Sequence, residues 1–261
     1  MASRAAPQTD WRDESAYAHL LAAEPSAFAW EWLRRDSGYR QAAAGVAARE
    51  VGTGSLLLRA DPAAAPWGLH AFEAADLNAC RARPVWRADP YGRVLAASAE
   101  AAGPWNDRFE LERYGGLATV VQDVCGSERI LISDGALSLR MDVEDGTMLH
   151  GPVRLAYRLA GLEGVERPLE TLRRLLSLWR TGRFVPPRIR NRNPRLILML
   201  RAADALAAGT TQREIASVLL SREPTPPRWR TEEPSLRMRA QRLAKGARAM
   251  VAGGYRSLLQ Q

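Results

Sequence analysis

The stretch between residues 115 and 158 limits the fold most narrowly, because four short apolar runs alternate there with glycine-containing turns. The runs occupy residues 117–121, 129–132, 136–141 and 153–157. Two of the turns contain an Asp-Gly pair, Asp134-Gly135 and Asp145-Gly146, and this pair between apolar runs favours a tight hairpin. The pattern predicts a β-rich middle region folded as an antiparallel meander.

Helical signals mark the front of the chain. Asp13 is placed to cap a first helix, and Pro25 stands at the first position of a second helix, where proline is favoured. The segment also holds Trp11, Trp30 and Trp32. Aromatic residues at helical spacing more often pack into a core than form a base-stacking platform. We therefore predict a small N-terminal helical hairpin with buried tryptophans.

Charge is divided unevenly along the chain. Residues 1–150 hold 15 Arg against 21 acidic residues, a net charge of −6, whereas residues 151–261 hold 22 basic and 8 acidic residues, a net charge of +14. Coding bias explains why Arg outnumbers Lys, but it does not explain why acidic residues become rare after residue 150. A basic half behind an acidic half indicates a polyanionic partner, and nucleic acid is the class that phosphate electrostatics favours.

An amphipathic helix opens the basic half. Residues 168–180 place five apolar side chains on one face and three Arg on the other, at helical spacing. Residues 182–194 then alternate Arg with Pro. Such a segment fits an arm that follows phosphates or lies in a minor groove, and it fits a charged connector equally well.

A helix-turn-helix pattern follows. We expect an apolar helix at residues 195–208, a break at Gly209-Thr210, and a short second helix that begins with Thr211 and Glu214 at capping-box spacing. The buried stripe of the short helix is expected at Ile215, Val218 and Leu219. This order of elements is typical of DNA-binding modules, and an ordinary helical hairpin is the alternative.

The last helix, expected at residues 235–251, is interpreted as the recognition helix. Its apolar stripe comprises Leu236, Ala240, Leu243, Ala247 and Met250, with polar and basic residues around it. Arg and Gln read guanine and adenine edges in the major groove, while Lys and further Arg hold phosphates. The predicted DNA contacts are Thr211, Gln212, Arg213, Arg228, Arg230, Arg237, Arg239, Gln241, Arg242, Lys245 and Arg248.

The connection between the last two helices is unusually long for such a module. It runs from Ser221 to Pro234 and contains four prolines. One interpretation is a wing-like loop that touches the DNA backbone through Arg222, Arg228, Trp229 and Arg230. The other is that the last helix serves oligomerisation while Thr211, Gln212 and Arg213 contact DNA. The sequence leaves both open.

Composition and motif searches exclude several other classes. No run approaches the roughly 18 consecutive apolar residues of a membrane span, and the first ten residues lack the apolar centre of a secretory signal, so we expect a cytoplasmic protein. Two Cys and three scattered His give no metal-ligand spacing, and no phosphate loop or nucleophile elbow is present. We expect no cofactor, no metal and no enzymatic activity. A hydrolase would need Cys125 or an acid beside one of the histidines.

Several stretches resemble one family of proteobacterial regulators. Residues 206–216 (LAAGTTQREIA), 235–237 and 252–259 resemble the RovC-type DNA-binding domain, long known as a domain of unknown function. Residues 10–40 resemble the small N-terminal domain of the same regulators, and residues 115–118, 131–135 and 151–154 also fit. The resemblance implies an FseA-like transcriptional activator of integrative and conjugative element excision and transfer, or of type VI secretion genes. It also implies binding to double-stranded promoter DNA as a homo-oligomer, a dimer or a larger assembly such as a hexamer.

Together these signals predict an α+β protein with an N-terminal helical hairpin, a β-meander middle region and a C-terminal all-α helix-turn-helix domain. The expected units are a helical N-terminal domain (1–40), a linker (41–66), a β-rich domain (67–160), an amphipathic helix with a basic linker (161–194) and the DNA-binding domain (195–261). We expect the acidic front to contact RNA polymerase or another regulator. The alternative function is an antiactivator that blocks a related regulator through its N-terminal aromatic residues.

Overall fold

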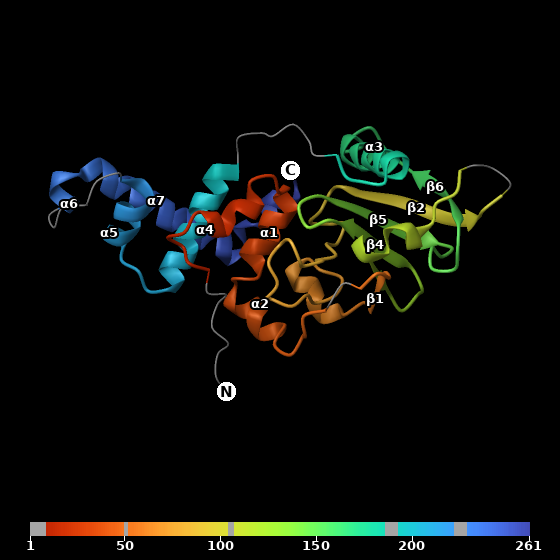
Figure 1. The fold of residues 1–261 in the computed structure, drawn as a ribbon, viewed down its shortest axis with the longest axis horizontal. Coiled ribbons are helices and arrows are strands. Elements are labelled where there is room, and N and C mark those ends of the chain that lie inside the picture. Colours follow the sequence, from red (N-terminus) through yellow and green to blue (C-terminus); the bar gives the residue numbers. More distant parts are fainter. Residues whose placement is uncertain (1–8, 50–51, 104–106, 186–192, 222–228) are drawn as a thin grey trace.

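The computed structural model describes residues 9–49, 52–103, 107–185, 193–221 and 229–261 (Figure 1). It joins one six-stranded sheet to a set of helices, which confirms the expected α+β class. Figure 1 shows the sheet at one end of the molecule, helices α5 to α7 at the other, and the N-terminal helices between them. Within these described ranges, no helix combines the length and the hydropathy that crossing a bilayer requires.

The sheet is mixed rather than a simple meander. Its strands are β1 (Leu56–Arg59), β2 (Val94–Ala101), β3 (Ala118–Gln122), β4 (Glu128–Ser133), β5 (Ser138–Asp145) and β6 (Val153–Arg158), in the spatial order β1-β3-β4-β5-β2-β6. The antiparallel meander is correct for β3, β4 and β5, but the fourth predicted run, β6, pairs antiparallel with β2 rather than with β5. The pairs β1 with β3 and β2 with β5 are parallel, which the meander did not predict. Strand β2 escaped the pattern because it is rich in Ala, which carries little β propensity.

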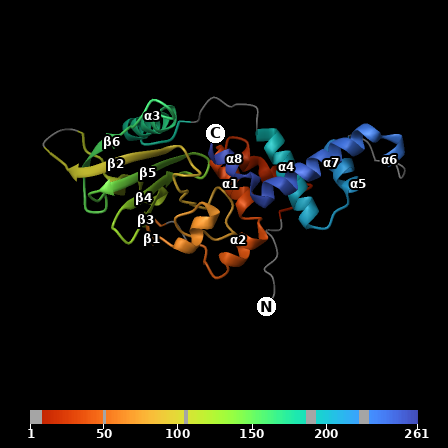
Figure 2. The same ribbon diagram turned by 180° about the vertical axis from the view of Figure 1, so that it is seen from behind.

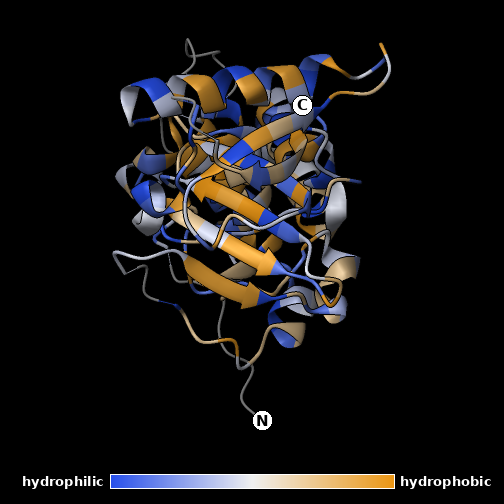
Figure 3. Cartoon of the chain, turned by 90° about the vertical axis from the view of Figure 1, so that its right-hand side faces the viewer, coloured by the Kyte–Doolittle hydropathy of each residue, from blue (hydrophilic) through white to orange (hydrophobic). Residues whose placement is uncertain are grey.

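One face of the sheet is covered by helix α3 (Glu166–Thr181). Side chains alternate along β5, so Leu139, Met141 and Val143 point to the same face and join a core that includes Leu175 and Leu178 of α3. Figure 3 shows α3 lying across the strands, with polar and apolar colours alternating along it. The predicted amphipathic helix is therefore present, and its apolar face packs on the sheet.

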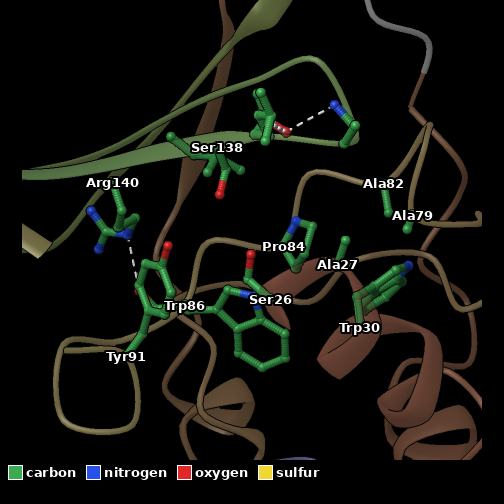
Figure 4. Close-up of a pocket in the computed structure, with 15 residues that line it drawn as sticks. Ser26, Ala27, Trp30, Ala79, Ala82, Pro84, Trp86, Tyr91, Ser138 and Arg140 are labelled. Atoms are coloured by element: carbon green, nitrogen blue, oxygen red, sulfur yellow. Dashed lines mark hydrogen bonds between the residues drawn. The ribbon is translucent and has the colours of Figure 1, made fainter. Parts of the chain in front are cut away.

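The other face of the sheet meets the segment between β1 and β2. Arg140 of β5 points to this side and is 1% exposed. Its Nε donates to the carbonyl of Trp86 at 2.9 Å, and its Nη1 donates to the carbonyl of Met141 at 2.7 Å (Figure 4). A cavity of about 30 Å³ lies beside it, bounded by Trp30 and Tyr91 among others. That volume matches a water molecule or two rather than a ligand.

Three short helical segments form the front of the chain: a 3-10 helix (Ser15–Leu20), α1 (Pro25–Leu33) and α2 (Ser37–Ala42). Pro25 stands at the start of α1 as predicted. The first segment is 3-10 rather than α-helical, and Asp13 accepts from the backbone N–H of Ser15 just before it. The tryptophans Trp11, Trp30 and Trp32 are 4%, 0% and 0% exposed, which confirms that they pack in the core.

The remaining helical segments lie between the strands or in the C-terminal part of the chain. Two 3-10 segments precede strands in the sequence: Pro62–Trp67 comes before β2, and Leu111–Leu117 comes before β3. The C-terminal helices are α4 (Asn193–Ala207), α5 (Gln212–Ile215), α6 (Trp229–Glu232), α7 (Pro234–Ala249) and α8 (Arg256–Leu259). One apolar core contains residues of the front and of the back, and α8 packs on α1. Figure 2 shows α7 running outward from this shared core.

Candidate nucleic-acid interface

The turn that separates α4 from α5 is built as the sequence predicts. Gly209 has a φ of +75°, a left-handed conformation that favours glycine at the end of a helix. Thr211 then caps α5, since its hydroxyl accepts from the backbone N–H of Glu214 at 3.3 Å while the Glu214 carboxylate accepts from the Thr211 backbone N–H at 2.9 Å. The backbone N–H and the hydroxyl of Thr211, which both donate to the Glu214 carboxylate, lower the pKa of Glu214. The capping box is therefore confirmed.

Helix α5 continues into a π-helical turn, Ala216–Leu220, which changes the predicted buried stripe. Ile215 is fully buried as expected, but Val218 is 42% exposed. A π turn holds more residues than an α turn, so Val218 rotates away from its predicted position, whereas Leu219 stays partly buried and packs on the core. Ala216 is buried instead, in a small cluster with Trp229, Leu236 and Ala240.

Helix α7 has one buried stripe and a broad exposed face. Leu236, Ala240, Ala244 and Ala247 are buried, close to the predicted stripe, whereas Leu243 and Met250 are partly buried. The buried side packs against α4, α5 and α6. Three or four residues separate successive buried positions, so the remaining faces of this 16-residue helix are available to solvent.

The predicted contacts on α7 divide between two flanks. At about 100° per residue, Arg237, Gln241 and Arg248 fall within about 40° of one another, and Lys245 lies about 40° further round. Arg242 lies about 60° beyond Lys245, opposite the buried stripe, and Arg239 lies about 60° beyond Arg242, on the other flank. All of these side chains are exposed except Arg237, which is partly buried and whose Nε is buried without a hydrogen bond in the described part of the chain.

The other predicted contacts lie around α5 and α6. Gln212 and Arg213 occupy the first turn of α5, next to the cap. The Thr211 hydroxyl donates to Glu214 Oε2 at 2.9 Å and so is already engaged. Arg228 and half of the Ser221 to Pro234 connection, residues 222–228, lie outside the described residues, as do residues 186–192 of the basic linker. Arg230 belongs to α6, but its side chain also lies outside the described part.

A buried polar network, which the sequence did not predict, holds α4 against the front of the chain. Arg35 donates from Nε and Nη2 to the two carboxylate oxygens of Asp204 at 2.6 and 2.8 Å, and the Tyr17 hydroxyl donates to the same carboxylate at 2.6 Å. Arg201 of α4 donates from Nε to the carbonyl of Trp11 at 2.9 Å. Arg201 and Asp204 are charged residues within the apolar helix α4, and this indicates that each has a buried polar partner. Nothing in the sequence identifies those partners.

Glu31 completes this network on the front side. Its carboxylate accepts from Arg34 Nε at 2.7 Å, from Arg35 Nη1 at 2.5 Å and from the backbone N–H of Ala79 at 2.7 Å. Burial alone raises the pKa of Glu31, but the nearby His19 imidazole, 3.9 Å from its Oε1, and the charges of Arg35 and Arg34 outweigh burial and hold the pKa well below its usual range. The network is thus ionised and closely paired.

The region offers no alternative metal chemistry in the part that the structure describes, where no three His, Cys, Asp or Glu side chains group as ligands. The exposed side chains of α7 and the first turn of α5 include several positively charged groups: Arg213, Arg239, Arg242, Lys245 and Arg248.

Comparison with protein families finds two matches along the chain. Residues 158–260 match the DNA-binding domain of a T6SS transcription factor, the RovC type. Residues 10–70 match a proteobacterial transcriptional regulator-like domain. No curated protein sequence matches the chain. These matches confirm the family resemblance expected from the sequence.

Proposed function

We propose that this DNA-binding transcriptional regulator, which joins a RovC-type DNA-binding domain to a proteobacterial regulator-like domain, is a sequence-specific activator that reads promoter DNA with α7. The observation that carries the proposal is the flank of Arg237, Gln241 and Arg248 beside the buried stripe of α7. A helix of 16 residues is about 24 Å long and fits the major groove, which is about 12 Å wide.

In this proposal α4 and α5 are the helix-turn-helix pair, joined by the turn at Gly209-Thr210, and α7 packs on both of them as the recognition helix. Arg237 and Gln241 contact base edges, because guanidinium and amide groups pair with guanine and adenine. Phosphate contacts come from the remaining predicted residues, which are Thr211, Gln212, Arg213, Arg228, Arg230, Arg239, Arg242, Lys245 and Arg248. The Thr211 contact competes with its capping bonds.

The wider role follows from the same assignment. We place its targets among integrative and conjugative element or type VI secretion genes, and its action in the cytoplasm, as a homo-oligomer without enzymatic activity. Exposed acidic residues of the front are the proposed contact with RNA polymerase or another regulator. The antiactivator alternative is weaker, because Trp11, Trp30 and Trp32 are buried and do not face a partner.

A gel-shift titration tests the proposal. Purified protein is titrated with its own upstream promoter duplex and with a scrambled duplex of equal length, at two salt concentrations. Specific regulators bind their sites at least about a thousandfold more tightly than random DNA, and phosphate contacts make the affinity fall steeply with salt. Equal, weak binding to both duplexes would contradict sequence-specific activation.

A further inference from the structure

A cleft lies where the front of the chain meets the DNA-binding helices. Its walls come from the turn between α1 and α2, the end of α4, and the end of α7 with the π turn Met250–Gly254. Its volume is about 400 Å³. Small-molecule sites typically occupy about 300 to 1,000 Å³, so the cleft is large enough for a compact ligand.

Small side chains keep this cleft open. Ala203 and Ala207 of α4 face Ala247 of α7 across it, and the partly exposed Leu206 and Val251 add branched apolar surface. Covering apolar surface that is in contact with water makes the free energy of ligand binding more favourable. The floor therefore favours a ligand with an apolar body.

The charged groups at the rim of the cleft differ in whether another residue of the protein already forms an ion pair or a hydrogen bond with them. Arg35 and Asp204 neutralise each other, as described above. Asp36 accepts from the backbone N–H of Tyr39 at 2.9 Å as the cap of α2. Arg248 is exposed and forms no ion pair with any other described residue. An anionic group on the ligand is the natural partner of this guanidinium.

We infer that the cleft binds a small amphipathic anion, an apolar body with a single carboxylate, and that the carboxylate pairs with Arg248. The consequence for DNA rests on the proposed function. Arg248 is one of the proposed phosphate contacts, so a bound ligand that occupies it lowers the affinity for DNA. The ligand also touches both the regulator-like segment and the DNA-binding segment, because the walls of the cleft come from both.

Calorimetry without DNA tests the site with two probes of equal shape, 4-phenylbutyrate and its neutral amide. The acid is expected to bind one per chain and about tenfold more tightly than the amide, because only the acid makes a charge-assisted contact. Arg248→Gln should remove this preference. Equal affinity for both probes, or no binding of the acid up to about 5 mM, would overturn the inference.

Two further variants locate the site. Ala207→Phe fills the cleft from an exposed position at the end of α4, and Ala249→Phe places the same ring on an exposed position of α7 outside the cleft. Only Ala207→Phe should weaken binding of the acid, by about tenfold or more. Unchanged binding to Ala207→Phe would show that the ligand binds elsewhere.

A final arm separates the cleft from the proposed function. The promoter titration is repeated with saturating 4-phenylbutyrate, which should lower DNA affinity in the wild type and not in Ala207→Phe. Ligand binding without any change in DNA affinity contradicts the coupling. If the chain binds no promoter DNA at all, the proposed function fails while calorimetry still decides whether the cleft is a site.

Discussion

The side chains of Arg35 and Asp204 form a two-point ion pair, although 169 residues separate them in the sequence. Arg35 lies in the segment that matches the regulator-like domain, and Asp204 lies in the segment that matches the DNA-binding domain. Both side chains are almost completely buried, at 5% and 7% exposure. Because α4 packs against α7, this pair fixes the position of the proposed recognition helix relative to the front of the chain.

Removing one partner of this pair should lower the free energy of unfolding substantially. Arg35→Met leaves the carboxylate of Asp204 buried without a guanidinium partner, whereas Glu31 keeps Arg34. Breaking a buried ion pair typically costs about 3 to 5 kcal/mol of the free energy of unfolding. Urea unfolding monitored by tryptophan fluorescence measures the loss. The double variant Arg35→Met with Asp204→Leu should recover part of it, since the Asp204 charge is then removed as well.

An exposed ion pair provides the control. Arg154 and Glu100 face each other across β6 and β2 at 3.8 Å, and their side chains are 50% and 51% exposed. Arg154→Met should therefore cost less than about 1 kcal/mol. A similar cost for both substitutions would mean that the buried pair contributes nothing beyond a surface contact.

Residues on one flank of α7 are expected to affect DNA binding in different ways. Arg237→Ala and Gln241→Ala should each cost about 1 to 3 kcal/mol on the cognate promoter and much less on random DNA, because they remove contacts with base edges. Arg248→Ala should weaken binding to both duplexes by a similar factor and reduce the salt dependence. Quantitative gel shifts measure all three. Equal losses on cognate and random DNA for every variant would contradict the assignment of base contacts.

Thr211 has a structural role that can be separated from a contact with DNA. Thr211→Ala removes the cap of α5 and should lower the free energy of unfolding by about 1 kcal/mol. Thr211→Ser keeps the hydroxyl and should restore most of the stability. The neighbouring substitution Thr210→Ala leaves the capping box intact and serves as the control in the same urea titrations. A loss of DNA affinity in Thr211→Ser at full stability would indicate that the methyl group touches DNA.

The sequence predicted the structure where the determining signal is local. The capping box at Thr211, the proline that starts α1 and the Asp-Gly turn at Gly135 each depend on a few neighbouring residues, and each is present. Partners distant in sequence were not predictable. The parallel pairing of β2 with β5 joins an Ala-rich strand to residues more than 40 positions later, and no local pattern marks that choice.

The same limit applies to the candidate site. Spacing alone placed Arg237, Gln241 and Arg248 on one flank of a helix, because helical periodicity is a local property. The attachment of that helix to the front of the chain depends on Arg35 and Asp204, and their pairing arises only once the shared core has formed. The π turn after α5 was also unpredictable, since it moves Val218 outward without any unusual residue type.

Two glycines with positive φ allow a matched test of close packing in the sheet. Gly135 in the β4–β5 turn has a φ of +94°, and a Cβ there would lie 2.6 Å from the Cα of Cys80. Gly126 in the β3–β4 turn has a φ of +86° and no atom within 4 Å of the same position. Gly126→Ala should cost about 1 kcal/mol from backbone strain alone. Gly135→Ala should cost about 2 kcal/mol more, because the clash forces the Cys80 segment to move. Thermal unfolding compares the two, and equal costs would contradict the close approach.

His70 should make the stability depend on pH. Its Nε2 is buried without a hydrogen bond in the described structure. Burial, followed by the positive charges of Arg140 and Arg129, lowers its pKa from 6.5 to about 3. The folded state therefore keeps His70 neutral, whereas the unfolded state binds a proton below about pH 6.5. Stability from this group is complete above that pH and is lost as the pH falls toward 3.

The expected loss is about 2 kcal/mol at about pH 5, since the unfolded state gains a proton that the folded state does not accept. His70→Gln removes the titrating group and should flatten this part of the stability profile, while His150→Gln, at an exposed position, should leave it unchanged. Urea unfolding at a series of pH values measures the three profiles. If His70→Gln retains the full dependence between pH 6.5 and 5, the assignment of that dependence to His70 is wrong. The stability that Glu31 contributes is itself lost only below the ordinary glutamate pKa of 4.5, so the two groups act in different pH ranges.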